Sequence, residues 1–321
     1  MSELLIDEFP EETCTVSIDI EDSIGETPRQ KFHRERLSGI GGSDVSAILG
    51  LNPYKTAHDL WLEKTGQREP DDLEGNEAVE WGNRLEDLVA EKFTEETGKR
   101  VRRNNRTLRS KLYPFMIAHL DREVVGERSI LECKTLGAWH KTEEWGESGT
   151  DNVPDRYLLQ CQHYLAVSGR DLAYLSVLIG GRNFRTYIIQ RDQDLIDMLV
   201  TAEGEFWQHV LDMTPPVFDP TAEGAFEAIK KLYPGTNGQT IALPDDVVSY
   251  HQTLQEQQQI VKDAESLVKS AKAAILAAMG ESAIGRLPDG TCYTRKTVQR
   301  EGYVVKPTAY VDFRYSKKVM S

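Results

Sequence analysis

The sequence predicts an α/β fold in which a small mixed β-sheet is flanked by helices. Three patterns support this prediction. Apolar residues recur at helical spacing over residues 76–97, two apolar runs enclose a turn over residues 116–134, and two β-like runs, 172–179 and 184–190, lie between helical segments. Strands that are interspersed with helices along a chain are typical of a sheet with helices packed on its faces.

The composition is that of an ordinary globular protein, because 39% of the 321 residues are hydrophobic and 28% are charged. A chain of this length holds one large domain or two modest ones. No apolar run approaches the roughly 18–20 residues that span a bilayer. The acidic N-terminus does not resemble a secretory signal. We therefore expect a cytoplasmic protein that acts away from membranes.

The net charge of −14 is concentrated at the N-terminus. Residues 1–30 contain nine acidic side chains and one basic side chain, so this segment carries −8 and the rest of the chain −6. We expect an acidic, mostly disordered arm over 1–30 with a short extended piece over 13–20. The remainder divides into a core over 31–215 and an extension over 216–321.

A glycine-rich loop opens the core and leads into a short helix, for which Ser43 or Asp44 is the predicted N-cap. Exposed amides and a hydroxyl at a helix start form an anion pocket, and Arg36 is near enough in sequence to add charge. A capped helix after a tight turn explains the same residues, and this feature alone favours that simpler interpretation.

The helix predicted over 76–97 carries an apolar stripe with Leu85, Val89 and Phe93. Glu86 lies at the border of this stripe. A carboxylate at such a border is usually a surface residue, although the same position allows it to lean into a site at the sheet edge.

A cationic segment follows, because residues 99–111 contain seven basic side chains and no acidic one. Arg102, Arg103 and Arg106 belong to it. Such a cluster suits a nucleic-acid backbone, where each neutralised phosphate releases counterions. A strand edge kept soluble by arginine explains the pattern equally well.

A candidate catalytic site is predicted at Asp121 and at Glu132-Cys133-Lys134, which follows it after ten residues. Side chains alternate along a strand, so Glu132 and Lys134 point to the same face, and an Asp on the neighbouring strand can meet them. Two carboxylates suit Mg²⁺, and a nearby ammonium can steady an attacking water or the charge of a transition state. An acid-x-Lys strand is more commonly a solvated face, but the apolar run before Glu132 indicates a buried strand.

The elements after this hairpin complete the predicted core. A loop over 136–152 is long enough to be a lid or a substrate contact. A helix follows over about 155–167, with Tyr157 and Gln160 one turn apart on the same side. After the second pair of strands, another helix runs over about 193–213.

The extension contains a long polar helix over about 245–279 and a tail in which basic and aromatic residues interleave up to residue 318. The weak apolar stripe of the helix predicts packing against one neighbour or another subunit. The tail composition is compatible with contacts to bases and phosphates, and also with ordinary β-hairpins.

Five segments in this order resemble the YqaJ-like phage recombination exonucleases, relatives of lambda exonuclease within the PD-(D/E)XK nuclease fold. They are GIGGSDVSAILGLNPYKT (39–56), WGNRLEDLVAEKF (81–93), PFMIAHLDRE (114–123), LECKT (131–135) and VPDRYLLQCQHYLAV (153–167). Together they cover about residues 33–213. One segment alone is weakly specific, but the joint occurrence of all five is hard to explain by chance. The resemblance implies a restriction-endonuclease-like nuclease core with a C-terminal extension of a helix and a β-hairpin.

The resemblance also implies roles for individual residues. Asp121 and Glu132 would ligate Mg²⁺, which Mn²⁺ can replace, together with the backbone carbonyl of Cys133. Lys134 would activate or orient the water, Glu86 would join the metal site directly or through water, and Gln160 would position the scissile phosphate or the water. The residues implied in DNA binding are Arg36 and Ser43 at the 5′-phosphate, with Tyr157, Arg102, Arg103 and Arg106.

Two positions depart from the family pattern. Arg122 stands where the family often has Gly, and Cys133 occupies a variable position. Neither change removes a ligand. Cys14, Cys161 and Cys292 are widely spaced from Cys133, so we expect no iron–sulfur cluster.

The implied function is an exonuclease that degrades one strand of linear double-stranded DNA, 5′ to 3′ from a phosphorylated end. The 3′ single strand would go to an annealing partner of RecT type, and the family suggests a homo-oligomeric, trimeric ring. Two alternatives stay open: a RecB-like end-processing nuclease or endonuclease on the same core, and an inactive DNA-end-binding recombination scaffold. The complete set of Asp121, Glu132, Lys134 and Gln160 argues against the scaffold.

Overall fold

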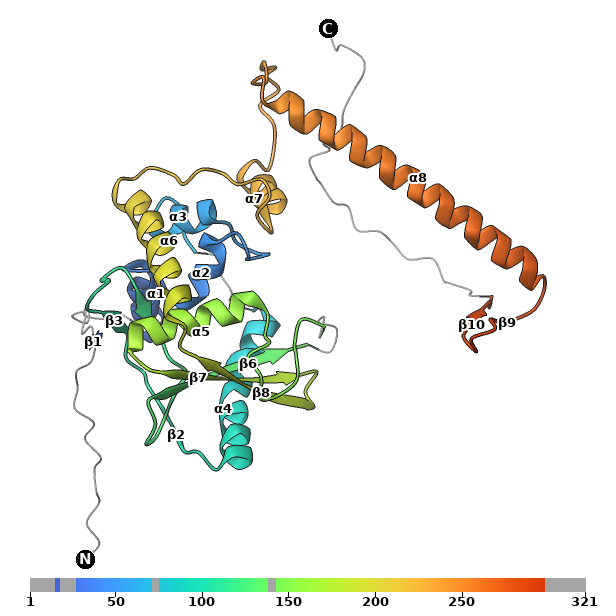
Figure 1. Cartoon of the computed structure of the whole chain (residues 1–321). Coiled ribbons are helices and arrows are strands. Elements are labelled where there is room, and N and C mark those ends of the chain that lie inside the picture. The colour runs from blue at the N-terminus through green and yellow to red at the C-terminus, as the bar shows by residue number, and fades with distance from the viewer. Residues whose placement is uncertain (1–14, 18–26, 71–74, 138–142, 298–321) are drawn as a thin grey trace, which may run out of the picture. The chain divides into compact units, whose positions relative to one another are not determined.

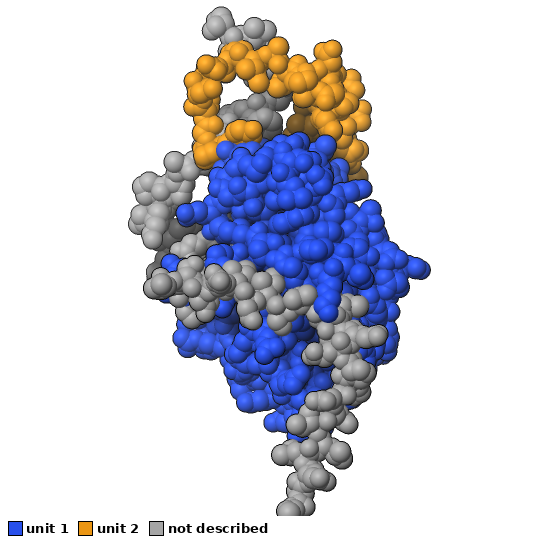
Figure 2. Space-filling model, turned by 90° about the vertical axis from the view of Figure 1, so that its left-hand side faces the viewer, with its two compact units in different colours: residues 1–232 blue, residues 233–321 orange. Residues whose placement is uncertain are grey.

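The computed structural model describes residues 15–17, 27–70, 75–137 and 143–297. The chain divides into two compact units, Met1–Leu232 and Tyr233–Ser321, which are coloured separately in Figure 2. Most of the predicted acidic arm, with Cys14, and the end of the basic tail lie outside the described residues, as do residues 138–142 of the predicted lid loop. The division into a core and an extension at residue 216 stays a prediction.

A five-stranded mixed sheet forms the centre of the first unit, with the strand order β2-β5-β6-β7-β8 (Figure 1). Its strands are β2 (Val101–Arg103), β5 (Arg122–Val124), β6 (Ser129–Leu136), β7 (Leu172–Ile179) and β8 (Asn183–Gln190). Strands β6 and β7 run parallel, and the other neighbouring pairs are antiparallel. The predicted mixed sheet is confirmed. Strands β5 and β6 form a hairpin as predicted, but its first strand is shorter than the predicted run, because residues 117–118 belong to a second sheet.

Helices pack on both faces of this sheet. The helices that pack directly on its strands are α4 (Glu77–Thr97) and α5 (Asp155–Ser168). The first unit also contains α1 (Pro28–Leu37), α2 (Gly42–Ile48), α3 (Ala57–Lys64), α6 (Gln193–Leu211) and α7 (Ala225–Leu232). On one face, Val89 and Phe93 of α4 pack with Leu131 of β6. On the other face, Leu165 of α5 shares the main core with Ile130 of β6. Consecutive residues of β6 thus enter opposite cores, as the pleat of a strand requires.

A second, three-stranded sheet connects the N-terminal helices to the hairpin. Its antiparallel strands are β1 (Thr15–Ser17), β3 (Leu108–Ser110) and β4 (Ile117–Ala118). The N–H of Ile40 donates to the Phe115 carbonyl at 2.7 Å, and the N–H of Ile117 donates to the Ile40 carbonyl at 2.9 Å. A Cβ at Gly39 would lie 2.8 Å from the Phe115 carbonyl oxygen, so this close approach requires glycine. The loop between α1 and α2 is therefore held near the start of the hairpin.

The second unit contains α8 (Val247–Met279) and an antiparallel hairpin of β9 (Ile284–Arg286) and β10 (Cys292–Thr294). The predicted long helix and the predicted hairpin of the extension are confirmed. Throughout the described part of the chain, no helix has both the length and the apolar character needed to cross a membrane.

Helices α5 and α6 are joined by a buried polar pair. His163 Nδ1 lies 2.9 Å from Glu203 Oε1, and neither side chain has exposed area. His163 Nε2 lies 2.8 Å from the carbonyl oxygen of Ile117, to which it donates. The second carboxyl oxygen of Glu203 is buried without a hydrogen-bond partner among the described residues. Glu203 therefore depends on His163 for its polar contact.

We predict that His163→Ala lowers the free energy of unfolding by about 3 kcal/mol, because it leaves the Glu203 carboxyl buried and unpaired. Urea denaturation followed by circular dichroism measures the change. Glu205→Ala, at an exposed position of α6, the helix that carries Glu203, is the matched control and is expected to change stability by under about 0.5 kcal/mol. Equal effects of the two substitutions would show that the buried pair does not stabilise the fold.

Candidate active site

Asp121, Glu132 and Lys134 come together on the α5 face of the sheet. Lys134 Nζ donates to Glu132 Oε1 at 2.7 Å, and the N–H of Cys133 donates to Asp121 Oδ2 at 2.8 Å. Asp121 directly precedes β5, and the antiparallel pairing of β5 with β6 brings it beside Cys133. Glu132 is buried, whereas Asp121 and Lys134 retain partial exposure. The structure thus assembles the three residues that the sequence pattern predicts to meet.

Gln160 fixes the orientation of the Glu132 carboxylate. Its amide nitrogen donates to Glu132 Oε1 at 2.8 Å and lies 3.0 Å from the Tyr164 hydroxyl oxygen. Sequence reasoning missed Tyr164, although its spacing of four residues from Gln160 places both on one side of α5. Lys134 and Gln160 both donate to Glu132 Oε1, and among the described residues Glu132 Oε2 accepts no hydrogen bond from the protein.

Electrostatic repulsion makes this cluster receptive to a cation. Burial, followed by the nearby Glu132 carboxylate, raises the pKa of Asp121 well above its usual value. Burial disfavours the Lys134 ammonium, but Glu132 and Asp121 outweigh it and raise the pKa of Lys134. Lys134 is therefore charged at neutral pH, and the two carboxyl groups repel each other where a divalent cation would relieve the repulsion.

The donor set fits a Mg²⁺ ion. In the described part of the chain, no three or more His, Cys, Asp and Glu side chains are grouped to hold a metal. The side chains that can ligate the ion are therefore the carboxylates of Asp121 and Glu132. Among the described residues, Asp121 Oδ1 and Glu132 Oε2 accept no hydrogen bond from the protein, so these two oxygens can face a metal ion. Mg²⁺ commonly binds through one or two carboxylates and keeps several waters.

Glu86 is engaged by Arg122 on the α4 side of the sheet. Arg122 donates to Glu86 Oε1 at 2.5 Å and also bonds the carboxylate of Asp87. Arg103 approaches the same Glu86 oxygen at 3.8 Å. The Arg122 side chain is 5% exposed, so its charge depends on these acids. Arg122, which departs from the family pattern, therefore holds the carboxylate that the resemblance implies as a metal ligand.

Arg36 and Ser43 lie together, as the predicted anion pocket requires. Arg36 Nη2 donates to Ser43 Oγ at 3.1 Å and to Asp44 Oδ1 at 3.0 Å. The other Asp44 oxygen accepts from Lys64 Nζ at 2.7 Å, and both of these side chains are 3% exposed. The N-cap prediction was wrong: Gly41 is the N-cap of α2, and Asp44, as the third helical residue, accepts from the N–H of Gly41 at 3.1 Å. Asp44 instead orients Arg36, and the buried Lys64 balances its charge.

The anion pocket adjoins the carboxylate cluster through Gly42. A Cβ at this residue would lie 2.5 Å from Tyr164 Cε1 and 3.0 Å from Gln160 Cγ. Only glycine allows the start of α2 to approach α5 this closely. The same contact sets the spacing between Ser43 and the residues that orient Glu132.

Three of the seven bases of the predicted cationic segment, Lys99, Arg102 and Arg103, form ion pairs among the described residues. Arg102 bonds Glu123 at 2.8 Å, and Arg103 bonds Asp87 at 2.6 Å. Arg106 is exposed and has no recorded ion pair within the described ranges. The acids lie on neighbouring elements, so the local run of bases in the sequence overstates the free positive charge of this surface.

Tyr157 borders Lys134 rather than the anion pocket. Lys134 Nζ lies 5.5 Å from the centre of the Tyr157 ring, a cation–π distance, and the Trp145 ring centre lies 5.3 Å from it. Trp145 is buried and comes from the loop after β6. Sequence reasoning identified this loop but did not single out Trp145 as its anchor.

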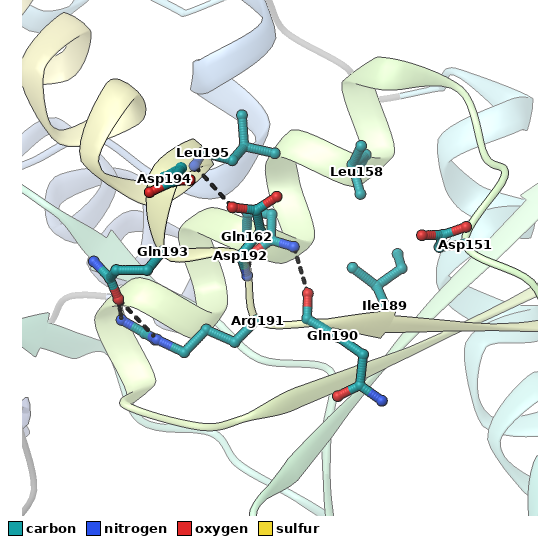
Figure 3. A pocket seen from close by; sticks show the side chains of 10 residues that line it. All are labelled: Asp151, Leu158, Gln162, Ile189, Gln190, Arg191, Asp192, Gln193, Asp194 and Leu195. Carbon is teal, nitrogen blue, oxygen red and sulfur yellow. Dashed lines mark hydrogen bonds between the residues drawn. The ribbon is translucent and has the colours of Figure 1, made fainter.

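A surface hollow of about 430 Å³ lies apart from these residues, between the end of β8 and the start of α6 (Figure 3). Several of its polar groups already have structural hydrogen bonds. Gln162 Nε2 donates to the Gln190 carbonyl at 2.7 Å, and Asp192 Oδ1 accepts from the N–H of Leu195 at 3.0 Å as the cap of α6 (Figure 3). None of the predicted site residues lines this hollow.

Comparisons with known proteins agree with the sequence motifs. Residues 31–171 match the family model of the YqaJ-like viral recombinase domain. The protein YqaJ of Bacillus subtilis (strain 168), described as uncharacterized, is 46% identical over 214 residues, which are 66% of this chain and 65% of the relative. The matched segment thus spans just under two thirds of that relative. The resemblance to the YqaJ-like family is confirmed.

Two solved structures share a similar chain path at low identity. One is the alkaline exonuclease LHK-Exo from Laribacter hongkongensis, with 18% identity and a TM-score of 0.48 over 64% of this chain and 100% of that chain. The other is a phage related exonuclease from Haemophilus somnus 129PT, with 19% identity and a TM-score of 0.40 over 55% of this chain and 96% of that chain.

We predict that Asp121→Asn stabilises the metal-free protein by about 1 kcal/mol, because it removes a poorly solvated carboxyl that opposes Glu132. The amide oxygen can still accept the N–H of Cys133. Urea denaturation in EDTA measures the change. Asp171→Asn, at an exposed residue paired with Arg128, is the control and should change stability by under about 0.5 kcal/mol.

The stabilisation by Asp121→Asn should depend on pH. The pKa of Asp121 is raised in the folded protein, so ionisation of this carboxyl costs folding free energy as the pH rises through the folded pKa. Below the unfolded pKa of about 4, the carboxyl is protonated in both states and this cost disappears. The difference between variant and wild type should therefore be small near pH 4 and grow toward neutral pH. A difference that is independent of pH would contradict this assignment of the buried charge.

Proposed function

We propose that this chain, whose residues 31–171 match the model of the YqaJ-like viral recombinase domain, is a metal-dependent exonuclease acting on the ends of double-stranded DNA. The observation that carries the proposal is the cluster of Asp121, Glu132 and Lys134, with Glu132 clamped by both Lys134 and Gln160. A cluster without a catalytic role would have little reason to hold two repelling carboxyl groups so close together.

The chain's own residues would divide the work of phosphodiester hydrolysis. Asp121, Glu132 and the carbonyl of Cys133 would hold a Mg²⁺ or Mn²⁺ ion, which lowers the pKa of a bound water and offsets charge on the phosphate. Lys134 stays protonated, so it orients the water or stabilises the charge that develops on the phosphate oxygens rather than removing a proton. Gln160 keeps the Glu132 carboxylate in one orientation.

In the proposed reaction, the water oxygen bonds to phosphorus while the bond from phosphorus to the leaving 3′ oxygen breaks, with inversion at phosphorus. The water loses a proton to solvent, and the 3′ oxygen gains one, so the products are a 3′-hydroxyl and a 5′-phosphate. This balance needs no reactant besides water and DNA.

End recognition would come from the anion pocket. Arg36 and Ser43 offer a guanidinium and a hydroxyl on the α2 side of the Gly42 contact, which suits a terminal 5′-phosphate near the carboxylate cluster. We propose 5′-to-3′ degradation on this basis, with Arg106, Arg102, Arg103 and Tyr157 as further DNA contacts. A 3′ single strand taken up by an annealing protein of RecT type and a ring-shaped homo-oligomer complete the proposal.

A digest of end-labelled linear duplex in Mg²⁺ tests the activity. We expect release of nucleotides from 5′-phosphorylated ends, protection of closed circles, and no product in EDTA. Cleavage of the circle would favour an endonuclease, and inactivity with Mg²⁺, Mn²⁺ and other divalent cations would favour the inactive end-binding scaffold.

We predict that Lys134→Ala lowers the cleavage rate at least about 100-fold, because it removes the cation nearest the reacting phosphate. Lys92→Ala, at an exposed position on α4, is the control and should retain the wild-type rate. Rates are measured under single-turnover conditions, after thermal unfolding has shown that both variants are folded. A wild-type rate in Lys134→Ala would exclude the proposed site.

We predict that Arg36→Ala reduces the preference for a 5′-phosphate over a 5′-hydroxyl about 10-fold or more, because a charge-assisted hydrogen bond is lost. The fold should persist, since Lys64 still pairs with Asp44. The measurement is the ratio of initial rates on the two duplexes. Arg128→Ala, at an exposed residue paired with Asp171, is the control and should leave the ratio unchanged. An unchanged ratio in Arg36→Ala would remove Arg36 from the end-binding pocket.

A further inference from the structure

Helix α8 carries an apolar seam that the described residues of its own unit leave uncovered. It is a single helix of 33 residues, about 50 Å long at 1.5 Å per residue, and it contains no buried residue. Leu254, Val261 and Val268 are 41%, 57% and 51% exposed. Exposed branched side chains at regular spacing along a long helix mark a surface that is covered by a partner.

The seam has a strict seven-residue period. Val247, Leu254, Val261, Val268 and Ile275 follow one another at this interval. The positions three residues later are Tyr250, Gln257, Ala264, Ala271 and Ala278, so they are small or aromatic apart from Gln257. Five consecutive repeats exceed the three to four heptads that usually indicate a coiled coil.

We propose that α8 pairs with α8 of a second copy of this chain in an antiparallel, two-stranded coiled coil. In an antiparallel pair, each first-position residue of the heptad faces a fourth-position residue of the other helix, whereas in a parallel pair like positions face each other. The order of large and small residues along α8 distinguishes these two arrangements.

The antiparallel register places a large residue opposite an alanine in three of its five kinds of pair, and the other two are Val268 with Gln257 and Ile275 with Tyr250. Val261 faces Ala264 of the second copy, Leu254 faces Ala271, and Val247 faces Ala278. A parallel pair would instead place Ala264, Ala271 and Ala278 each against its own equivalent and leave three underfilled layers. Layers that combine a large and a small side chain fill the space between two helices better than layers of two alanines.

The residues that flank the seam favour the same arrangement. In the antiparallel register Ile260 faces Leu267 of the second copy, which widens the apolar surface, and Gln258 faces Glu265 on the opposite flank. A parallel pair would place Ile260 against Glu265 and Leu267 against Lys272, so apolar side chains would face charges. The flanking residues therefore favour antiparallel over parallel pairing of two identical helices.

The molar mass of the full-length protein tests the pairing. Sedimentation equilibrium compares wild type with Val261→Glu/Val268→Glu, which places two charges in the seam. The control, Gln259→Glu/Ser266→Glu, adds the same charges on the outer face of the same turns. Whether the wild type is a dimer or two rings joined through α8, we expect the seam variant to have half its mass and the control to match it. Equal masses for wild type and seam variant would overturn the proposal.

Disulfide crosslinking tests the orientation in a chain that also carries Cys14→Ser and Cys292→Ser. Gln257 faces Val268 of the second copy in the antiparallel register and lies about 16 Å along the axis from its own equivalent, too far for a disulfide. Chains with Gln257→Cys or with Val268→Cys should therefore crosslink only when the two are co-expressed. Crosslinking of either variant with itself would show parallel pairing, and failure of the co-expressed pair to crosslink would contradict the register. Neither outcome depends on nuclease activity.

Discussion

The pleat of strand β6 is the constraint on which the candidate site depends. Because β6 lies inside the sheet with helices on both faces, its alternate residues enter different environments. Leu131 joins the core beneath α4, whereas Glu132 and Lys134 turn toward α5. A shift of one residue in the pairing with β7 would bury the charges under α4 and direct Leu131 at Gln160. The long parallel ladder with β7 therefore protects the chemistry as well as the fold.

Two neighbouring clusters carry opposite excesses of charge. When both carboxyl groups are ionised, Asp121 and Glu132 outnumber Lys134, which leaves a negative excess, whereas Arg36 and Lys64 outnumber Asp44, which leaves a positive excess. The contact of Gly42 with Tyr164 and Gln160 joins the elements that carry them. A substrate that brings a metal ion to the first cluster and a terminal phosphate to the second would neutralise both. This complementarity gives the proposed exonuclease a physical basis in the folded chain.

Several cations beside the candidate site are committed to internal partners. Arg122 is held by Glu86 and Asp87, Arg103 shares Asp87, and Arg102 bonds Glu123. These pairs tie α4 and β2 to β5 beside the candidate site. Part of the local run of bases consequently acts as structural support, and binding of a phosphate backbone would depend on exposed cations without such pairs, such as Arg106.

The local chemistry of the site was predictable from the sequence because it depends on short-range geometry. The spacing of Asp121 and Glu132 across one hairpin, the shared face of Glu132 and Lys134, and the apolar stripe of α4 all follow from strand and helix periods. Motif order also predicted that Arg36 and Ser43 meet.

The tertiary structure decided which partners these groups have. It places Arg122 on Glu86, Asp44 between Arg36 and Lys64, and Gln160 on Glu132. These contacts join residues from 8 to 36 positions apart, and no local period encodes them, because they arise only when helices pack on the sheet.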